Sequence, residues 1–234
     1  MRDSARGDAQ VSIDADRLDS AADEGDSYER TRALLEANHG TELALLATLR
    51  ACDVKPEDAR PYREVEKELE AVPSVAESTQ TSHTLIEMLV RSGGVAAVPV
   101  PEQHGTKDNP EGPAPADKPT GHLVHITDAG RAVLTDFDPQ RRFEELLAEE
   151  PAGYADAYAR VLAACEGTHP DGAGLSRAEV ESVLSDDPAL TNPRRVYPSY
   201  FISKLESIEG LIWDGGWRTT DAGERMLDAL AMSS

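Results

Sequence analysis

Two stretches of this chain have the same pattern, and that pattern decides the fold. LIEMLVRSGGV (residues 85–95) is followed by HITDAGRAVL (125–134), and FISKLESIEGLIWDGGWRTTDAGERML (201–227) repeats both parts. Gly94 matches Gly210 at an offset of 210 − 94 = 116, whereas Thr127 matches Thr220 at 220 − 127 = 93. The offset falls only between the two parts, by 116 − 93 = 23. One unit therefore occurs twice, and its first copy contains a longer hairpin, where loops tolerate insertions.

Each copy predicts the same order of elements: helices, then a β-hairpin, then a closing helix. Apolar residues at helical spacing predict helices in the first copy at residues 28–52 with a break at His39-Gly40-Thr41, 62–71, 74–92 and 129–137. In the second copy the expected helices are 153–165, one that starts in the capping box Ser176-Arg177-Ala178-Glu179, and 198–209. The expected strands are 95–100 and 122–126, then 211–213 and 217–219 around Asp214-Gly215-Gly216.

The composition separates these units from two segments of different character. Residues 1–26 are rich in Asp and almost free of large apolar side chains, which predicts a disordered acidic tail. Residues 101–120 are rich in Pro and Gly and predict a long loop inside the first hairpin. The whole chain has 23 Lys and Arg against 44 Asp and Glu, a net charge of −21. This charge disfavours nonspecific attraction to phosphate backbones and membrane surfaces, but it does not exclude a local basic patch.

The repeated unit, with Thr-Asp-Ala-Gly between its hairpin and its last helix, resembles the winged helix-turn-helix domain of bacterial and archaeal transcription regulators. The resemblance covers both copies but neither the acidic tail nor the long loop. It implies a mainly α fold with small β-hairpin wings (α+β), built as two winged-helix domains in tandem. The first domain is expected at residues 27–138 with the wing loop at 101–120, followed by a connecting helix at 139–150 and the second domain at 151–234.

The resemblance also implies a binding mode, in which the third helix of a unit enters a major groove and the wing contacts the backbone or minor groove. The third helix of the first copy is close to neutral and offers Thr79, Gln80, Ser82 and Arg91. The second copy is the better candidate, because its Arg and Lys can bind guanine edges or phosphate. Its candidate residues are Arg194, Arg195, Tyr197, Ser199, Tyr200, Lys204 and, on the wing, Arg218. We therefore expect a DNA-binding transcription regulator whose partner is double-stranded DNA.

Other features of the sequence favour a different function. Arg194 and Arg195 follow Asp186-Asp187 by a short loop, so they could be paired with acids or solvated. Tyr197 and Tyr200 have the spacing of core residues. The negative charge and the near-neutral first helix favour an acidic tandem winged-helix adaptor that binds another protein in a larger assembly. Homodimerisation is left open, because no long heptad pattern decides it.

No pattern of catalytic or metal-binding residues stands out, so an enzyme, a cofactor and a metal site are not expected. His122 and His125 lie three residues apart on an expected strand and would point to opposite faces. Cys52 and Cys165 lie in apolar helical patterns without the spacing of a metal or redox pair, which predicts two buried small hydrophobes. The lack of a long apolar run predicts no membrane partner, and the cytoplasm is the expected compartment.

Overall fold

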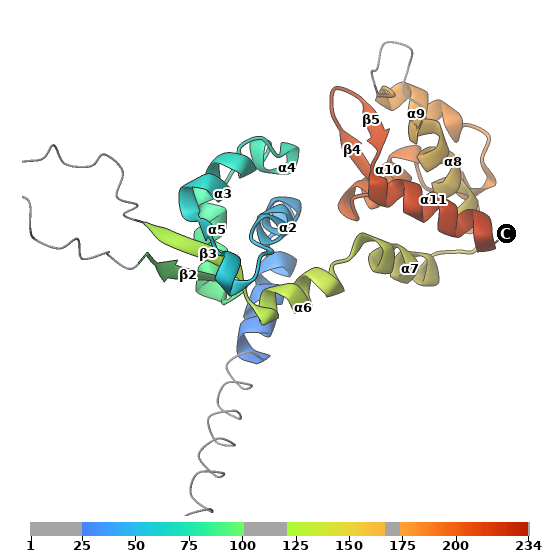
Figure 1. Ribbon diagram of the computed structural model, residues 1–234. Helices are drawn as coiled ribbons and strands as arrows, with labels where there is room; N and C mark the ends of the chain where they lie inside the picture. Colours follow the sequence, from blue (N-terminus) through green and yellow to red (C-terminus); the bar gives the residue numbers. More distant parts are fainter. Residues whose placement is uncertain (1–24, 101–120, 167–173, 234) are drawn as a thin grey trace, which may run out of the picture. The chain divides into compact units, whose positions relative to one another are not determined.

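The computed structural model describes residues 25–100, 121–166 and 174–233, which form two compact units that divide between Thr135 and Asp136 (Figure 1). These residues are mainly helical, with a three-stranded antiparallel sheet in the first unit and a two-stranded hairpin in the second. The expectation of an α+β fold is confirmed. The expected acidic tail, up to residue 24, and the expected wing loop 101–120 lie outside the described residues.

The described part of the first unit starts with a helix over residues 25–37, and a turn at the expected break separates it from the next helix. The elements that follow are α2 (Glu42–Ala51), the short 3-10 helix η1 (Pro56–Asp58), β1 (Arg60–Pro61), α3 (Tyr62–Leu69), α4 (Pro73–Ala76), α5 (Ser82–Ser92), β2 (Val95–Pro99), β3 (His122–Ile126) and α6 (Asp128–Asp136). The sheet order is β1-β3-β2, with Val95 opposite Ile126 and Arg60 opposite Val124. Leu35, Leu45 and Leu89 are fully buried in its core.

The prediction of one helix over residues 74–92 is wrong. Helix α4 ends at Ala76, and α5 begins only at Ser82. Polar side chains in between bind the backbone themselves: the Thr81 hydroxyl accepts from the Thr84 amide at 3.2 Å, and the Ser78 hydroxyl accepts from the Gln80 amide at 3.1 Å. Ser and Thr compete in this way with helical hydrogen bonds and favour caps, so the helix restarts at Thr81.

The second unit contains six helical elements and a hairpin in its described part. They are α7 (Pro139–Glu149), α8 (Tyr154–Glu166), α9 (Arg177–Val183), the 3-10 helix η2 (Pro188–Leu190), α10 (Pro198–Ser207), β4 (Leu211–Trp213), β5 (Trp217–Thr219) and α11 (Asp221–Ser233). The expected connecting helix is α7, and it packs against α11 within this unit. Asp138 caps α7 by accepting from the amides of Gln140 and Arg141.

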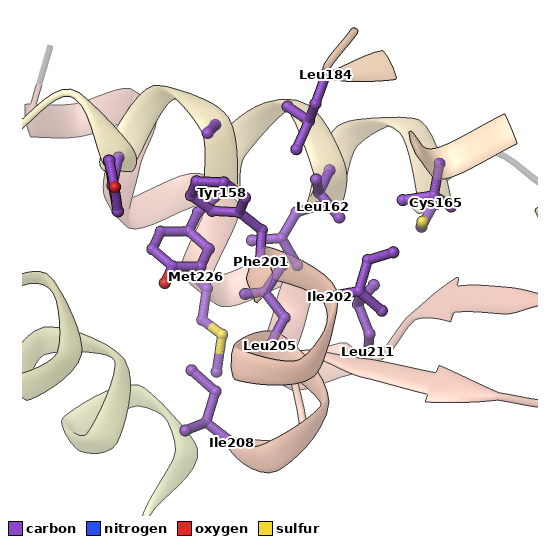
Figure 2. Close-up of a cluster of buried hydrophobic side chains, with 14 of the residues drawn as sticks. Tyr158, Leu162, Cys165, Leu184, Phe201, Ile202, Leu205, Ile208, Leu211 and Met226 are labelled. Atoms are coloured by element: carbon purple, nitrogen blue, oxygen red, sulfur yellow. The ribbon is translucent and has the colours of Figure 1, made fainter. Parts of the chain in front are cut away.

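Aromatic and aliphatic side chains of α8 and α10 form the core of the second unit (Figure 2). Tyr158 and Phe201 are fully buried, with ring centroids 5.1 Å apart at 72°. Tyr154 meets Phe201 at the same centroid distance. Edge-to-face rings of this kind add about 0.5 to 1.5 kcal/mol per pair beyond the area that they bury. The outer face of α10 is therefore held in place by the aromatic contacts of its inner face.

The two units share one order of elements. In the first, β1 pairs with β3, and β3 pairs with β2. In the second, Leu175 forms an isolated antiparallel bridge to Trp217 of β5, and β5 pairs with β4. Leu175 thus occupies the position of β1, just before the capping box in which Ser176 and Glu179 satisfy each other's backbone amides. The duplication seen in the sequence is a duplication of topology.

The same joint closes both units, at the Thr-Asp-Ala-Gly motif. The Thr127 hydroxyl donates to the Gly93 carbonyl at 2.7 Å and accepts from the Gly130 amide at 3.1 Å. The Thr220 hydroxyl likewise donates to the carbonyl of Glu209 and accepts from the Gly223 amide at 3.0 Å. Each hydroxyl links the end of one helix to the start of the last helix.

Glycine is required at both joints because backbone lies directly against it. A Cβ on Gly130 would overlap the carbonyl oxygen of Gly94, and a Cβ on Gly223 would overlap that of Gly210. Both overlaps involve main chain, which cannot move aside as a flexible side chain would. The last helix therefore approaches the end of α5 or α10 only where no side chain intervenes.

We predict that Gly223→Ala destabilises the second unit by about 2 to 3 kcal/mol, the cost of overpacking against rigid neighbours. The matched control is Gly153→Ala in the same unit, where a Cβ would meet nothing within 4 Å. This control should change the free energy of unfolding by less than about 0.5 kcal/mol. Urea denaturation followed by circular dichroism measures both, and equal values for the two variants would contradict the joint described above.

Candidate nucleic-acid interface

Helix α10 presents a polar outer face because its apolar residues all point inward. Pro198 occupies its first turn, where a fixed φ and a missing amide cost nothing. Phe201, Leu205 and Ile208 are buried at helical spacing. The residues at the complementary positions are exposed or partly exposed, and they are Ser199, Tyr200, Ser203, Lys204, Glu206 and Ser207. This face has small side chains around one tyrosine and one lysine, and its one acid, Glu206, lies in the last turn of the helix.

Cations gather on the tyrosines at the start of this helix. The guanidinium carbon of Arg194 lies 5.8 Å from the centroid of the Tyr200 ring, and Nζ of Lys204 lies 5.8 Å from the same centroid. Arg195 lies 5.6 Å from the ring centroid of Tyr197. At exposed sites such contacts contribute about 0.5 to 1 kcal/mol each. Arg194, Arg195, Tyr197, Tyr200 and Lys204 are called the tyrosine–cation cluster below.

The acids that precede the cluster do not neutralise it. Asp187 is buried, where its Oδ1 accepts from the Ala189 amide at 2.9 Å and its Oδ2 pairs with Arg160 at 3.2 Å. No ion pair joins Arg194, Arg195 or Lys204 to a carboxylate of the described residues. The sequence from Pro188 to Leu205 also contains no Asp or Glu. Three cations therefore remain available in a chain with a net charge of −21.

The two tyrosines of the cluster differ in burial. Tyr197 is 64% exposed, so the interpretation of Tyr197 as a core residue is wrong. Tyr200 is half-buried and meets Tyr154 edge to face at 6.2 Å, and its hydroxyl donates to the Glu150 carboxylate. Burial first, and then Glu150, raises the pKa of Tyr200 to about 12. The hydroxyls of Tyr154 and then Tyr200 raise the pKa of Arg194, because phenol oxygens stabilise the charged guanidinium.

The hairpin of the second unit contributes one cation and an exposed aromatic. Arg218 lies on β5 opposite Ile212 and is half-buried. Trp213 lies at the end of β4, 40% exposed, with its ring 5.3 Å from that of Trp217. The expected site residues include Arg218 on this hairpin but not Trp213. The exposure of Trp213 could have been predicted from its position beside the tight Asp214-Gly215-Gly216 turn, since residues at a hairpin tip have little to pack against.

The candidate residues of the first unit do not form a comparable surface. Thr79 and Gln80 lie in the turn before α5 rather than on the expected helix, and Ser82 is buried, so their expected place on an exposed third-helix face is wrong. Arg91 forms an ion pair with Glu87 at 3.9 Å. The exposed face of α5 thus carries paired charge, because acids of the same helix and of α3 lie beside its basic groups.

His83 shows the same pairing on α5. Its Nδ1 lies 3.0 Å from the Tyr62 hydroxyl and 3.4 Å from a Glu66 carboxylate oxygen. Burial, followed by the charges of Glu87 and Glu66, raises the pKa of Tyr62 to about 12. This network joins α3 to α5 and leaves the face of α5 close to neutral.

Among the residues described, no three or more His, Cys, Asp or Glu side chains are grouped so that they could hold a metal ion. Nor does any helix in the described ranges have the length and apolar character needed to cross a membrane. Cys52 and Cys165 are buried, as the sequence predicts. Burial raises the pKa of Cys52 to about 12 and that of Cys165 to about 11.

Comparison with known proteins gives no further assignment. A scan of the chain against models of protein families found no match, and searches of curated proteins and of solved structures found none either.

The cysteines give a prediction that needs no ligand. Only a thiolate attacks a disulfide reagent, and both thiols are buried with raised pKa values, so neither should react at pH 8 in the folded protein. Both should react at once in 6 M guanidinium, a concentration at which even stable domains are generally unfolded. Absorbance of the released thiol from Ellman's reagent measures this. Fast labelling of either cysteine in the folded chain would contradict the burial of that helix face.

Above pH about 9, ionisation of these thiols in the unfolded chain should also lower the free energy of unfolding, since the folded chain keeps them protonated up to their raised pKa values.

Proposed function

We propose that the chain is a DNA-binding transcription regulator composed of two winged-helix units, with the second unit as the one that contacts DNA. The shared order of elements supports the winged-helix assignment. In both units a short segment before the second helix of the repeat pairs with the second strand of the hairpin, as β1 pairs with β3 and as Leu175 pairs with Trp217 of β5. The helix before the hairpin, α5 or α10, is then the helix that a major groove would receive.

One observation carries the proposal for the second unit. Arg194 and Lys204 both lie over the Tyr200 ring, and neither forms an ion pair with a carboxylate of the described residues. Stacking holds the two long side chains near the outer face of α10. Less conformational entropy is then lost when they bind phosphate or a base edge.

The cluster suggests a division of roles. Arg194 and Arg195 precede the helix, where backbone amides of the first turn add further donors for a phosphate. Lys204 lies one helical turn further along, on the face with Ser203 and Ser207, and suits a guanine edge or a second phosphate. We assign the wing contact to Arg218, because it lies on β5 of the hairpin.

A second candidate function is an acidic adaptor that binds another protein. The observation that favours it is the face of α5, where Arg91 pairs with Glu87 and His83 lies beside Glu66. Such a neutral face offers little to a phosphate backbone. The exposed Trp213 would suit a protein surface, because tryptophan is enriched at the centres of protein interfaces.

We predict that Arg194→Ala with Arg195→Ala abolishes the gel shift of a duplex selected from random oligonucleotides, while the loss of two cation–π contacts lowers the free energy of unfolding by only about 1 to 2 kcal/mol. Losing two phosphate contacts should also reduce the slope of log K against log salt by about 1.8. The matched control is Arg177→Ala with Arg225→Ala, which removes two other exposed arginines of the same unit. Binding by the control should fall far less.

Two results would overturn this function. One is a selection in which no duplex is enriched over a control by the full chain at low salt. The other is an equal loss of binding in the two double variants. Co-purification of one stoichiometric protein partner, together with the first result, would favour the adaptor.

A further inference from the structure

A carboxylate contacts one tyrosine of the tyrosine–cation cluster, although the sequence separates it from Tyr200 by fifty residues. Glu150 directly follows the last residue of α7, where its amide donates to the Leu146 carbonyl at 3.1 Å. Its Oε1 accepts the hydroxyl proton of Tyr200. The end of α7 therefore fixes an acid against the outer face of α10.

The groups around Tyr200 match what a phosphate needs. The hydroxyl is a donor at the edge of the Tyr200 ring, and Arg194 and Lys204 each lie over that ring, 5.8 Å from its centroid. Phosphate oxygens are bound in proteins by arginine, lysine and hydroxyl donors of this kind. In the free protein the anion beside this donor is the chain's own carboxylate.

Glu150 is not committed to another partner that would explain its place. No ion pair joins it to a basic side chain within the described ranges, and the hydrogen bond that its carboxylate makes there is with Tyr200. Its neighbour Glu149 lies in the last turn of α7 and is exposed. Of these two adjacent acids, only the partly buried Glu150 contacts the cluster.

We propose that Glu150 is an internal competitor for a DNA backbone phosphate. Its carboxylate occupies the Tyr200 hydroxyl beside Arg194 and Lys204 in the free protein, and a backbone phosphate of the duplex replaces it on binding. This inference rests on the proposed function. It adds to that function a binding site for one DNA phosphate and the residue, Glu150, that competes with the phosphate for that site. Because a DNA phosphate must displace the Glu150 carboxylate, this contact alone adds little affinity for DNA, and tight binding requires several contacts at once.

The test compares Glu150→Gln with Glu149→Gln in the full chain, on the same selected duplex. Glutamine keeps an oxygen that can accept from Tyr200, so Glu150→Gln removes the charge and leaves the hydrogen bond possible. Both variants change the net charge by the same amount. A phosphate contact contributes a slope of about 0.9 in log K against log salt, so Glu150→Gln should steepen the slope by about 0.9 and tighten binding about eightfold at 0.1 M salt.

Glu149→Gln should tighten binding by no more than about twofold, because exposed charges at a distance are screened. Tyr200→Phe separates a local effect from a general one. It removes the hydroxyl that holds Glu150, so in that background Glu150→Gln should change affinity no more than Glu149→Gln does.

The outcomes are distinct. Binding by Glu150→Gln that is tighter than that of Glu149→Gln supports the inference, including the case in which the unaltered chain binds too weakly to detect. Equal binding by the two variants, with clear binding by the unaltered chain, overturns the inference and leaves the proposed function standing. If neither the unaltered chain nor Glu150→Gln binds any duplex, the inference and the proposed function both fail.

Discussion

The architecture depends on one backbone contact that occurs in each unit, at which the last helix starts against the end of the helix before the hairpin. Gly130 lies against the Gly94 carbonyl and Gly223 against that of Gly210, and a threonine hydroxyl bridges each junction. The chain must turn sharply just before these carbonyls. Gly93 does so at a φ of 91°, and Glu209 adopts a φ of 62° at the equivalent place, although L residues rarely take this conformation. The closing helix and the hairpin are both positioned by this joint.

The joint is the same in both units, but the helices that it anchors, α5 and α10, have different outer faces. On α5, Arg91 and His83 have acidic neighbours, and the break before the helix removes Thr79 and Gln80 from its face. On α10, the cations stack on tyrosines, and the nearby Asp187 is buried against Arg160. Duplication of a fold thus leaves each copy free to carry a different surface, because fold and site depend on opposite faces of one helix.

Much of the fold could be predicted because its signals are local. The strand 122–126 and both strands of the second hairpin have the predicted bounds, since alternating apolar residues and the Asp214-Gly215-Gly216 turn specify them. The helix break at Thr81 was missed because a cap competes with a continuing apolar stripe, and tertiary packing decides between them. The bond between Tyr200 and Glu150 could not be found, since it joins elements fifty residues apart. The stacking of Arg194 on Tyr200 was missed as well, because it depends on side-chain geometry rather than on residue type.

The central claim is that α10, and not α5, is the surface that meets DNA. Amide hydrogen exchange of the full chain, with and without a duplex selected by it, tests this claim most directly, because protection is read segment by segment in both units at once. We predict that the duplex slows exchange over residues 194–207 and in the hairpin 211–219, and leaves α5 unchanged. Protection confined to α5, or the same exchange with and without the duplex, would contradict the claim.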